Sequence, residues 1–178
     1  MKSIVVVLHN IRSVHNVGSI FRTADAAGIS KIYVTGITPT PLDRFGVVRP
    51  DFKKVSLGAE RSVPWEYVWS AAALLQKLKN PSRGGGYKIW AVEQAKNSVP
   101  YYRVKYHASG VKKVALVFGN EVRGLPASVL KKADKTLEVP MRGAMVREAH
   151  HPRHVGRGKE SLNVSVAFGI VAFSLLQK

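Results

Sequence analysis

Polar residues that could hold a ligand adjoin two of the apolar runs of this chain, before one and after the other. Ser161-Leu-Asn163 comes directly before an apolar segment of small residues that is typical of a buried helix. A buried helix does not require polar residues at its start, so we expect these residues to face a ligand. Gly119-Asn-Glu121 follows another run; the glycine would let backbone approach a ligand, and the Glu121 carboxylate could accept from a hydroxyl or an amine. An ordinary loop with Glu121 at a helix N-terminus would explain the same residues.

A third polar segment, residues 16–22, opens a predicted helix. Asn16 is a good N-cap residue, and Gly18 would allow another segment to approach closely. Arg22 lies a little under two turns further on and would project near the same side as Ser19 and Asp25. Arg22 could therefore serve a site, or it could simply pair with Asp25 on a solvated face.

Other kinds of chemistry find little support. The chain has no cysteine, which excludes disulfides and thiolate catalysis. The glycine patterns of phosphate loops, dinucleotide-binding turns and serine-hydrolase elbows are missing. His150 and His154 have the helical spacing of metal ligands, but Pro152 between them breaks that helix. We therefore expect no metal site there, and a basic surface loop instead.

The charge balance indicates a polyanionic partner. Lys and Arg number 28 against 11 Asp and Glu, which gives a net charge of +17, and 46% of the 178 residues are hydrophobic. A folded domain with such an excess is typical of nucleic-acid binding, although a basic ribosome-associated or merely soluble surface would also account for it. Tyr101, Tyr102 and Tyr106, interleaved with basic residues, could stack on bases or pack on the sheet as an edge element.

Apolar runs alternate with helical patterns along the whole chain. This alternation predicts a single α/β domain over residues 1–178, with a parallel sheet covered by helices on both faces. In such sheets ligands bind at the carboxyl ends of the strands, where His9-Asn10, Glu93-Gln94, Gly119-Asn-Glu121 and Pro140-Met141 would lie. The expected strands are residues 4–8, 31–35, 87–92, 113–118 and 136–139, the expected helices 16–27, 63–79, 126–132 and 163–176, and residues 36–54 a loop.

Neither end of the chain predicts a membrane element. The first apolar run is too short for a signal peptide, and residues 164–176 are fewer than a membrane span needs. We therefore expect a soluble, cytoplasmic protein.

Three segments resemble the SpoU (TrmH-like) branch of the SPOUT RNA methyltransferases. Residues 10–28 resemble the first motif, residues 118–125 the second, and residues 139–143 with 159–167 the third. All three occur in order along the chain, so the joint match is specific. The chain departs from the pattern at residues 144–158, a basic insertion within the third motif that could gate the site, contact RNA or disturb cofactor binding.

The resemblance implies an α/β fold with a C-terminal trefoil knot, usually a homodimer, that moves a methyl group from S-adenosylmethionine to a ribose 2′-hydroxyl of tRNA or rRNA. No appended RNA-binding domain is recognised, so we expect RNA affinity to come from this domain. The implied cofactor-binding residues are Val92, Gly119, Val139, Met141, Ser161 and Leu162.

Asn16, Arg22, Glu121 and Asn163 match the positions around the target ribose and are the expected catalytic residues. The resemblance implies that Arg22 activates the 2′-hydroxyl, and because arginine is a poor base, orientation or phosphate-assisted proton removal is the expected role. Glu121 could fix Arg22 or close the pocket across the dimer. The arginines expected to contact RNA are Arg12, Arg22, Arg123, Arg142, Arg147, Arg153 and Arg157.

Two alternatives stay open on the same fold. One is a catalytically silent RNA-binding or ribosome-assembly protein, and the other is an RNA base methyltransferase. Binding of S-adenosylmethionine would separate the first from an enzyme, and the identity of the methylated nucleoside would separate the second.

Overall fold

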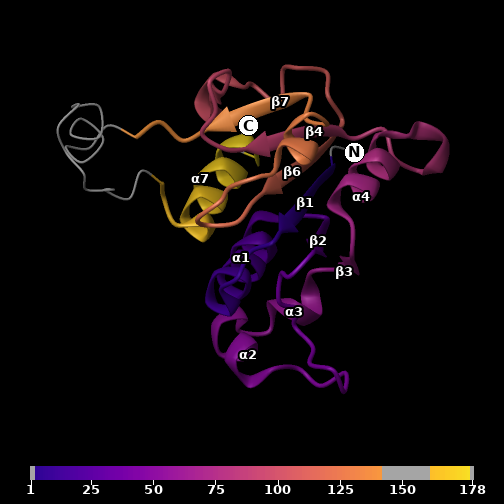
Figure 1. Cartoon of the computed structure of the whole chain (residues 1–178), viewed down its shortest axis with the longest axis vertical. Coiled ribbons are helices and arrows are strands. Elements are labelled where there is room, and N and C mark those ends of the chain that lie inside the picture. Colours follow the sequence, from indigo (N-terminus) through magenta and orange to yellow (C-terminus); the bar gives the residue numbers. More distant parts are fainter. Residues whose placement is uncertain (1–2, 142–160, 177–178) are drawn as a thin grey trace.

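A parallel sheet of seven strands forms the centre of the computed structural model, which describes residues 3–141 and 161–176 (Figure 1). Every strand pair is parallel, and the strand order is β3-β2-β1-β6-β4-β7-β5. The carboxyl ends of neighbouring strands therefore share one edge of the sheet. The strands are β1 (Ser3–His9), β2 (Lys31–Thr35), β3 (Trp65–Val68), β4 (Lys88–Val92), β5 (Val99–Pro100), β6 (Lys113–Phe118) and β7 (Lys135–Glu138).

Helices cover both faces of the sheet, as predicted. Alternate residues of β1 point to opposite faces: Val6 packs in the same core as α1 (Val14–Ala27) and α7 (Val164–Leu176), while Val7 packs in the core of α4 (Ala71–Lys79). The remaining helical segments are α2 (Pro50–Ser56), α3 (Ala59–Ser62), α5 (Ala127–Leu130) and the 3-10 turns η1 (Pro81–Arg83) and η2 (Tyr101–Arg103).

The first helix begins earlier than the sequence predicts. Ser13, not Asn16, is its N-cap, and the Ser13 side chain accepts from the backbone N–H of Asn16 at 3.2 Å. The Asn16 side chain is thereby released from capping and can take part in other contacts. Gly28 ends the helix in the left-handed conformation, as expected. The close approach expected at Gly18 is also present, since an added Cβ there would lie 3.0 Å from Cβ of Val55.

The helix predicted for residues 63–79 is wrong in its first half. Residues 65–68 form β3, which pairs with β2, and α4 begins only at Ala71 with Ser70 as its cap. Aromatic and β-branched residues favour the sheet there, and the helical pattern belongs to the residues that follow. The loop predicted for residues 36–54 also ends early, because Pro50 opens α2 at a position where the missing N–H is harmless.

Tyr106 packs on the sheet. Its side chain is 2% exposed, meets the Trp90 ring edge-on at 5.9 Å, and donates to the carbonyl oxygen of Lys112 at 3.1 Å. Tyr101 packs partly against the same core, whereas Tyr102 is exposed. The three tyrosines could have stacked on bases or packed on the sheet, and Tyr106 packs on the sheet.

Within residues 3–141 and 161–176, no helix combines the length and the apolar character that crossing a membrane requires.

Candidate functional site

A cavity of about 150 Å³ lies where β4, β6 and β7 end and α7 begins. This is the edge of the sheet at which ligands bind in open α/β folds. Met141, one of the six residues predicted to bind the cofactor, is described by the structure but does not line the cavity. The other five do: Val92, Gly119, Val139, Ser161 and Leu162.

One wall of the cavity is a tight turn after β6. The Asn120 side-chain oxygen accepts from the backbone N–H groups of Val122 and Arg123, each at 2.9 Å, and Gly124 has a φ of +63°. An added Cβ on Gly119 would lie 2.7 Å from the carbonyl carbon of Gly124. Only glycine fits at residue 119 while the turn keeps this shape, so backbone forms this part of the wall.

Glu93 braces the same turn from the neighbouring strand. Its Oε2 accepts from the backbone N–H of Leu125 at 2.7 Å, and its Oε1 accepts from that of Gln94 at 3.1 Å. Glu93 also lines the cavity. The sequence places it only among the polar residues after strands, because nothing local reveals that β4 lies beside β6 and brings this carboxylate to residue 125.

Three of the four predicted catalytic residues form a polar chain at the cavity. Asn16 Nδ2 donates to Glu121 Oε1 at 2.9 Å, and Asn163 Nδ2 donates to Asn16 Oδ1 at 3.0 Å. Glu121 Oε2 also accepts from the backbone N–H of Arg12 at 3.3 Å. These residues come from the start of α1, the turn after β6 and the mouth of α7. Asn163 is exposed and Asn16 and Glu121 are half-buried, and their amide and carboxylate groups could bind hydroxyl groups of a ligand.

The electrostatic environment holds Glu121 ionised. Burial raises the pKa of its carboxyl, but the hydrogen bond from Asn16 and those from backbone N–H groups outweigh burial, so the pKa lies below its ordinary value. Since the lowered pKa belongs to the folded state, the ionised carboxylate stabilises the fold at neutral pH. That contribution is lost as the pH falls through the folded pKa.

We expect Glu121→Gln to lower the free energy of unfolding at neutral pH, and the difference from the wild type to shrink below the unfolded pKa of about 4.3. Urea unfolding at several pH values between about 3 and about 7 measures this difference. Asp25→Asn, which changes an exposed carboxylate of α1, is the matched control. A difference that stays constant over this range would contradict the assignment.

Arg22, the fourth predicted catalytic residue, does not line this cavity. It lies six residues beyond Asn16 on α1, a rise of about 9 Å, and lines a second hollow with Lys54 and Phe173 among others. Among the described residues the ion pairs are Lys31–Glu66, Arg49–Asp51 and Lys79–Asp134, so the pair between Arg22 and Asp25 is not formed.

The described lining of the cavity is negative although the protein is strongly basic. The carboxylates of Glu93, Glu121 and Glu138 line it, and no Lys or Arg is among its described lining residues. Glu138 Oε2 accepts from the Ser98 hydroxyl at 2.8 Å, so neutral donors serve all three carboxylates. A pocket of this kind favours a ligand that carries positive charge.

Three of the predicted RNA-contacting arginines, Arg12, Arg22 and Arg123, are exposed. Arg12 and Arg123 lie on the segments that carry the polar chain and the cavity wall. The insertion at residues 144–158, with His150 and His154, falls outside the described residues, as do Arg142, Arg147, Arg153 and Arg157.

A sequence profile of the SpoU rRNA Methylase family matches residues 3–146. The chain is 30% identical over 172 residues to the 23S rRNA (guanosine-2′-O-)-methyltransferase RlmB of Photorhabdus laumondii, a match that covers 97% of this chain and 59% of that protein. The chain thus spans about 59% of the length of the curated relatives that it matches first.

Solved structures agree with the sequence comparison. The TrmH/SpoU tRNA modifying enzyme of A. aeolicus superposes with a TM-score of 0.74 at 28% identity, over 99% of this chain and 75% of that one. The AdoMet-bound rRNA methyltransferase of Sinorhizobium meliloti superposes with a TM-score of 0.75 at 27% identity, over 97% and 55% respectively.

Proposed function

Since this chain belongs to the SpoU rRNA methylase family, we propose that it transfers a methyl group from S-adenosylmethionine to a ribose 2′-hydroxyl of tRNA or rRNA. One observation carries the proposal: four segments distant in the sequence, the ends of β4, β6 and β7 and the start of α7, meet at one cavity. Val92, Gly119, Val139, Ser161 and Leu162 line it, and the polar chain of Asn16, Glu121 and Asn163 lies beside it.

The residues present fit this cofactor. The turn that begins at Gly119 offers a wall of backbone, which an adenosine can approach closely. Glu93, Glu121 and Glu138 surround the cavity with negative charge, which suits the positive sulfonium. When bound, S-adenosylmethionine supplies an activated methyl group. The task of the protein is then to align the nucleophile and to help remove its proton.

The roles of the polar residues follow from their chemistry. The amides of Asn16 and Asn163 can hold the target ribose, and Glu121 keeps Asn16 in place through its hydrogen bond. Arg22 orients the 2′-hydroxyl and, with a nearby phosphate of the RNA, makes the loss of its proton easier. Free deprotonation by a guanidinium is not required.

We further infer a homodimer in which Arg22 of one protomer serves the cavity of its partner. Within one chain Arg22 lines a different hollow from the cavity. Phe173 of α7 lines that hollow with 43% of its surface exposed, and Val166 of the same helix is 50% exposed, so an apolar surface is available for a second copy. The trefoil knot stays a prediction from the family.

Nucleoside mass spectrometry of RNA incubated with the protein and S-adenosylmethionine tests the function. We expect 2′-O-methylated nucleosides. Methylated bases without ribose methylation would replace the proposal with base methylation. Absence of S-adenosylmethionine binding in calorimetry, with RNA binding intact, would leave a non-catalytic RNA-binding protein.

Deleting residues 144–158 is expected to weaken RNA binding and to make its salt dependence shallower. The segment carries Arg147, Arg153 and Arg157 against the single carboxylate of Glu148. Loss of up to three phosphate contacts would reduce the slope of log affinity against log salt by roughly 2.

Fluorescence anisotropy with labelled tRNA at several salt concentrations measures this slope. A variant that keeps the length but replaces the three arginines with glutamine is the control for the change in chain length. An unchanged slope in both variants would rule out a phosphate-contacting role.

A further inference from the structure

The loop between β2 and α2 presents an aromatic side chain to solvent. Figure 1 shows this purple segment, residues 36–49, projecting from the body of the protein below β3 and α3. Phe45 is 74% exposed and Val47 61% exposed in this loop. Exposed apolar side chains do not stabilise the fold, so the fold itself gives no reason for a phenylalanine here.

Asp43 holds the tip of this loop in one shape. Its Oδ1 accepts from the backbone N–H groups of Phe45 at 2.8 Å and Val47 at 3.0 Å. The backbone N–H of Asp43 donates to the carbonyl oxygen of Val47 at 2.8 Å, and Gly46 takes the positive φ of +78° that the turn needs. The tip is therefore pre-organised although it is exposed.

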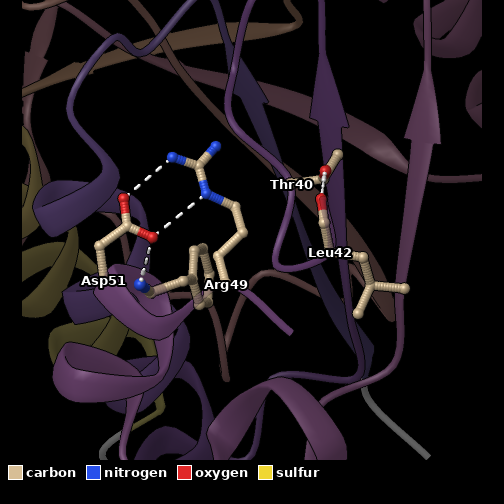
Figure 2. A network of polar contacts seen from close by, with 5 residues as sticks. Thr40, Leu42, Arg49 and Asp51 are labelled. Carbon is tan, nitrogen blue, oxygen red and sulfur yellow. Dashed lines mark hydrogen bonds and ion pairs between the residues drawn. The ribbon is translucent and has the colours of Figure 1, made fainter. Parts of the chain in front are cut away.

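An ion pair and a hydroxyl hydrogen bond hold the base of the loop (Figure 2). Arg49 donates through Nε and Nη2 to the two carboxylate oxygens of Asp51, at 3.2 and 2.9 Å, and the Thr40 hydroxyl donates to the carbonyl oxygen of Leu42 at 2.7 Å. An antiparallel bridge joins Leu42 to Val48. These contacts hold the two arms of the loop together at its base.

A cation lies against the aromatic ring, and further cations follow on α2. The Arg44 guanidinium lies 4.7 Å from the centre of the Phe45 ring, and Lys53 and Lys54 are exposed on α2. Backbone N–H groups engage Asp43, and Arg49 engages Asp51, so both carboxylates are already used within the segment. An exposed ring beside a guanidinium, on a protein with a net charge of +17, complements a polyanion that carries aromatic groups, which is the chemistry of single-stranded nucleic acid.

The loop starts from the same edge of the sheet as the cavity. Thr35, the last residue of β2, pairs with His9 of β1, and the preceding β1 residue, Leu8, pairs with Phe118 at the end of β6. Two strand spacings, about 10 Å, therefore separate the root of the loop from the cavity wall. Arg44 and Phe45 lie nine and ten residues beyond this root, so a single strand that runs from the cavity to the tip of the loop must span more than this separation.

We propose that Arg44 and Phe45 form a platform, the Arg44–Phe45 platform, that binds an unpaired nucleobase of the RNA substrate outside the cavity. The base stacks on the Phe45 ring, and Arg44 contacts the adjoining phosphate. The proposal rests on the proposed function for the identity of the RNA, but the platform itself can be tested with a simple oligonucleotide.

The test compares Phe45→Ala and Phe45→Trp in the full chain, using anisotropy of a labelled oligoadenylate of about 12 nucleotides. We expect about tenfold weaker binding for Phe45→Ala and near wild-type binding for Phe45→Trp, because the larger ring can still stack. The salt slope stays unchanged in Phe45→Ala, whereas Arg44→Gln lowers it by about 1. Binding of heparin, which has no bases, stays unchanged in Phe45→Ala.

Leu57→Ala is the matched control, because Leu57 is an apolar side chain that is 64% exposed outside the loop. Equal affinity of Phe45→Ala and the wild type for oligoadenylate would overturn the platform, and this is the result expected if the loop docks a protein instead. An equal loss in Leu57→Ala would overturn it too. Failure of the methyltransferase proposal is separate, since it appears as absent S-adenosylmethionine binding by the wild type.

Discussion

Replacing Arg22 with alanine is expected to abolish methyl transfer while affinity for S-adenosylmethionine stays close to that of the wild type. Arg22 does not line the cofactor cavity, so its loss leaves that wall intact. A group that orients a hydroxyl and assists its proton transfer contributes about 10²- to 10⁴-fold to the rate. Single-turnover methylation of tRNA and rRNA measures the rate, and calorimetry measures cofactor affinity.

Arg61→Ala is the control for this loss of charge, because Arg61 is an exposed arginine of α3. It should keep nearly full activity. If Arg22→Ala instead loses affinity for the cofactor but still turns over the cofactor that is bound, Arg22 binds the cofactor and does not activate the 2′-hydroxyl.

Replacing Gly119 with alanine is expected to weaken cofactor binding. The added Cβ would lie 2.7 Å from the carbonyl carbon of Gly124 and 2.8 Å from the nitrogen of Leu125, so the turn must move. Overpacking of this kind costs about 1–3 kcal/mol, which corresponds to about 5- to 150-fold in affinity if the whole cost falls on the bound state. Titration calorimetry with S-adenosylmethionine measures it.

Gly169→Ala is the matched control for Gly119→Ala. The position lies within α7, and an added Cβ there meets only the Thr23 side chain at the ordinary distance of 3.7 Å. Alanine also favours helix, so the control should bind cofactor normally. Normal cofactor binding by Gly119→Ala would show that the turn is not the cofactor wall.

Co-assembly of the two variants tests the shared site, with activity measured at a cofactor concentration too low to saturate Gly119→Ala. If Arg22 serves the partner's cavity, a heterodimer of Arg22→Ala and Gly119→Ala has one site with both residues intact. Random assortment should then restore about a quarter of wild-type activity. Recovery requires exchange of subunits, so the two proteins are co-expressed, and complete absence of activity would contradict the shared site.

Much of the fold follows from local pattern. The apolar run that became β1 has the composition of a strand buried on both faces, and the helical spacing of Val17, Ile20 and Phe21 identifies the inner face of α1. The prediction failed at residues 63–79, where β3 exists because it pairs with β2. Strand formation there depends on a neighbour that local pattern does not reveal.

Local sequence patterns predict only part of the candidate site and of the proposed RNA contacts. Gly119, Ser161 and Asn163 draw attention because their types are unusual at the ends of apolar runs. Glu93 and Phe45 do not, since a glutamate after a strand and a phenylalanine in a loop are ordinary. Their significance comes from the backbone of Leu125 in the first case and from solvent exposure in the second.

The sequence by itself determined the layered α/β class, the basic character and the three family motifs, because periodicity, charge and motif order are properties of the linear chain. Only the tertiary structure decided which polar groups meet. The side chain of Asn16 reaches Glu121 across 105 residues and Asn163 across 147. Such contacts depend on the strand order β1-β6-β4-β7, and short-range patterns carry no information about which strands become neighbours.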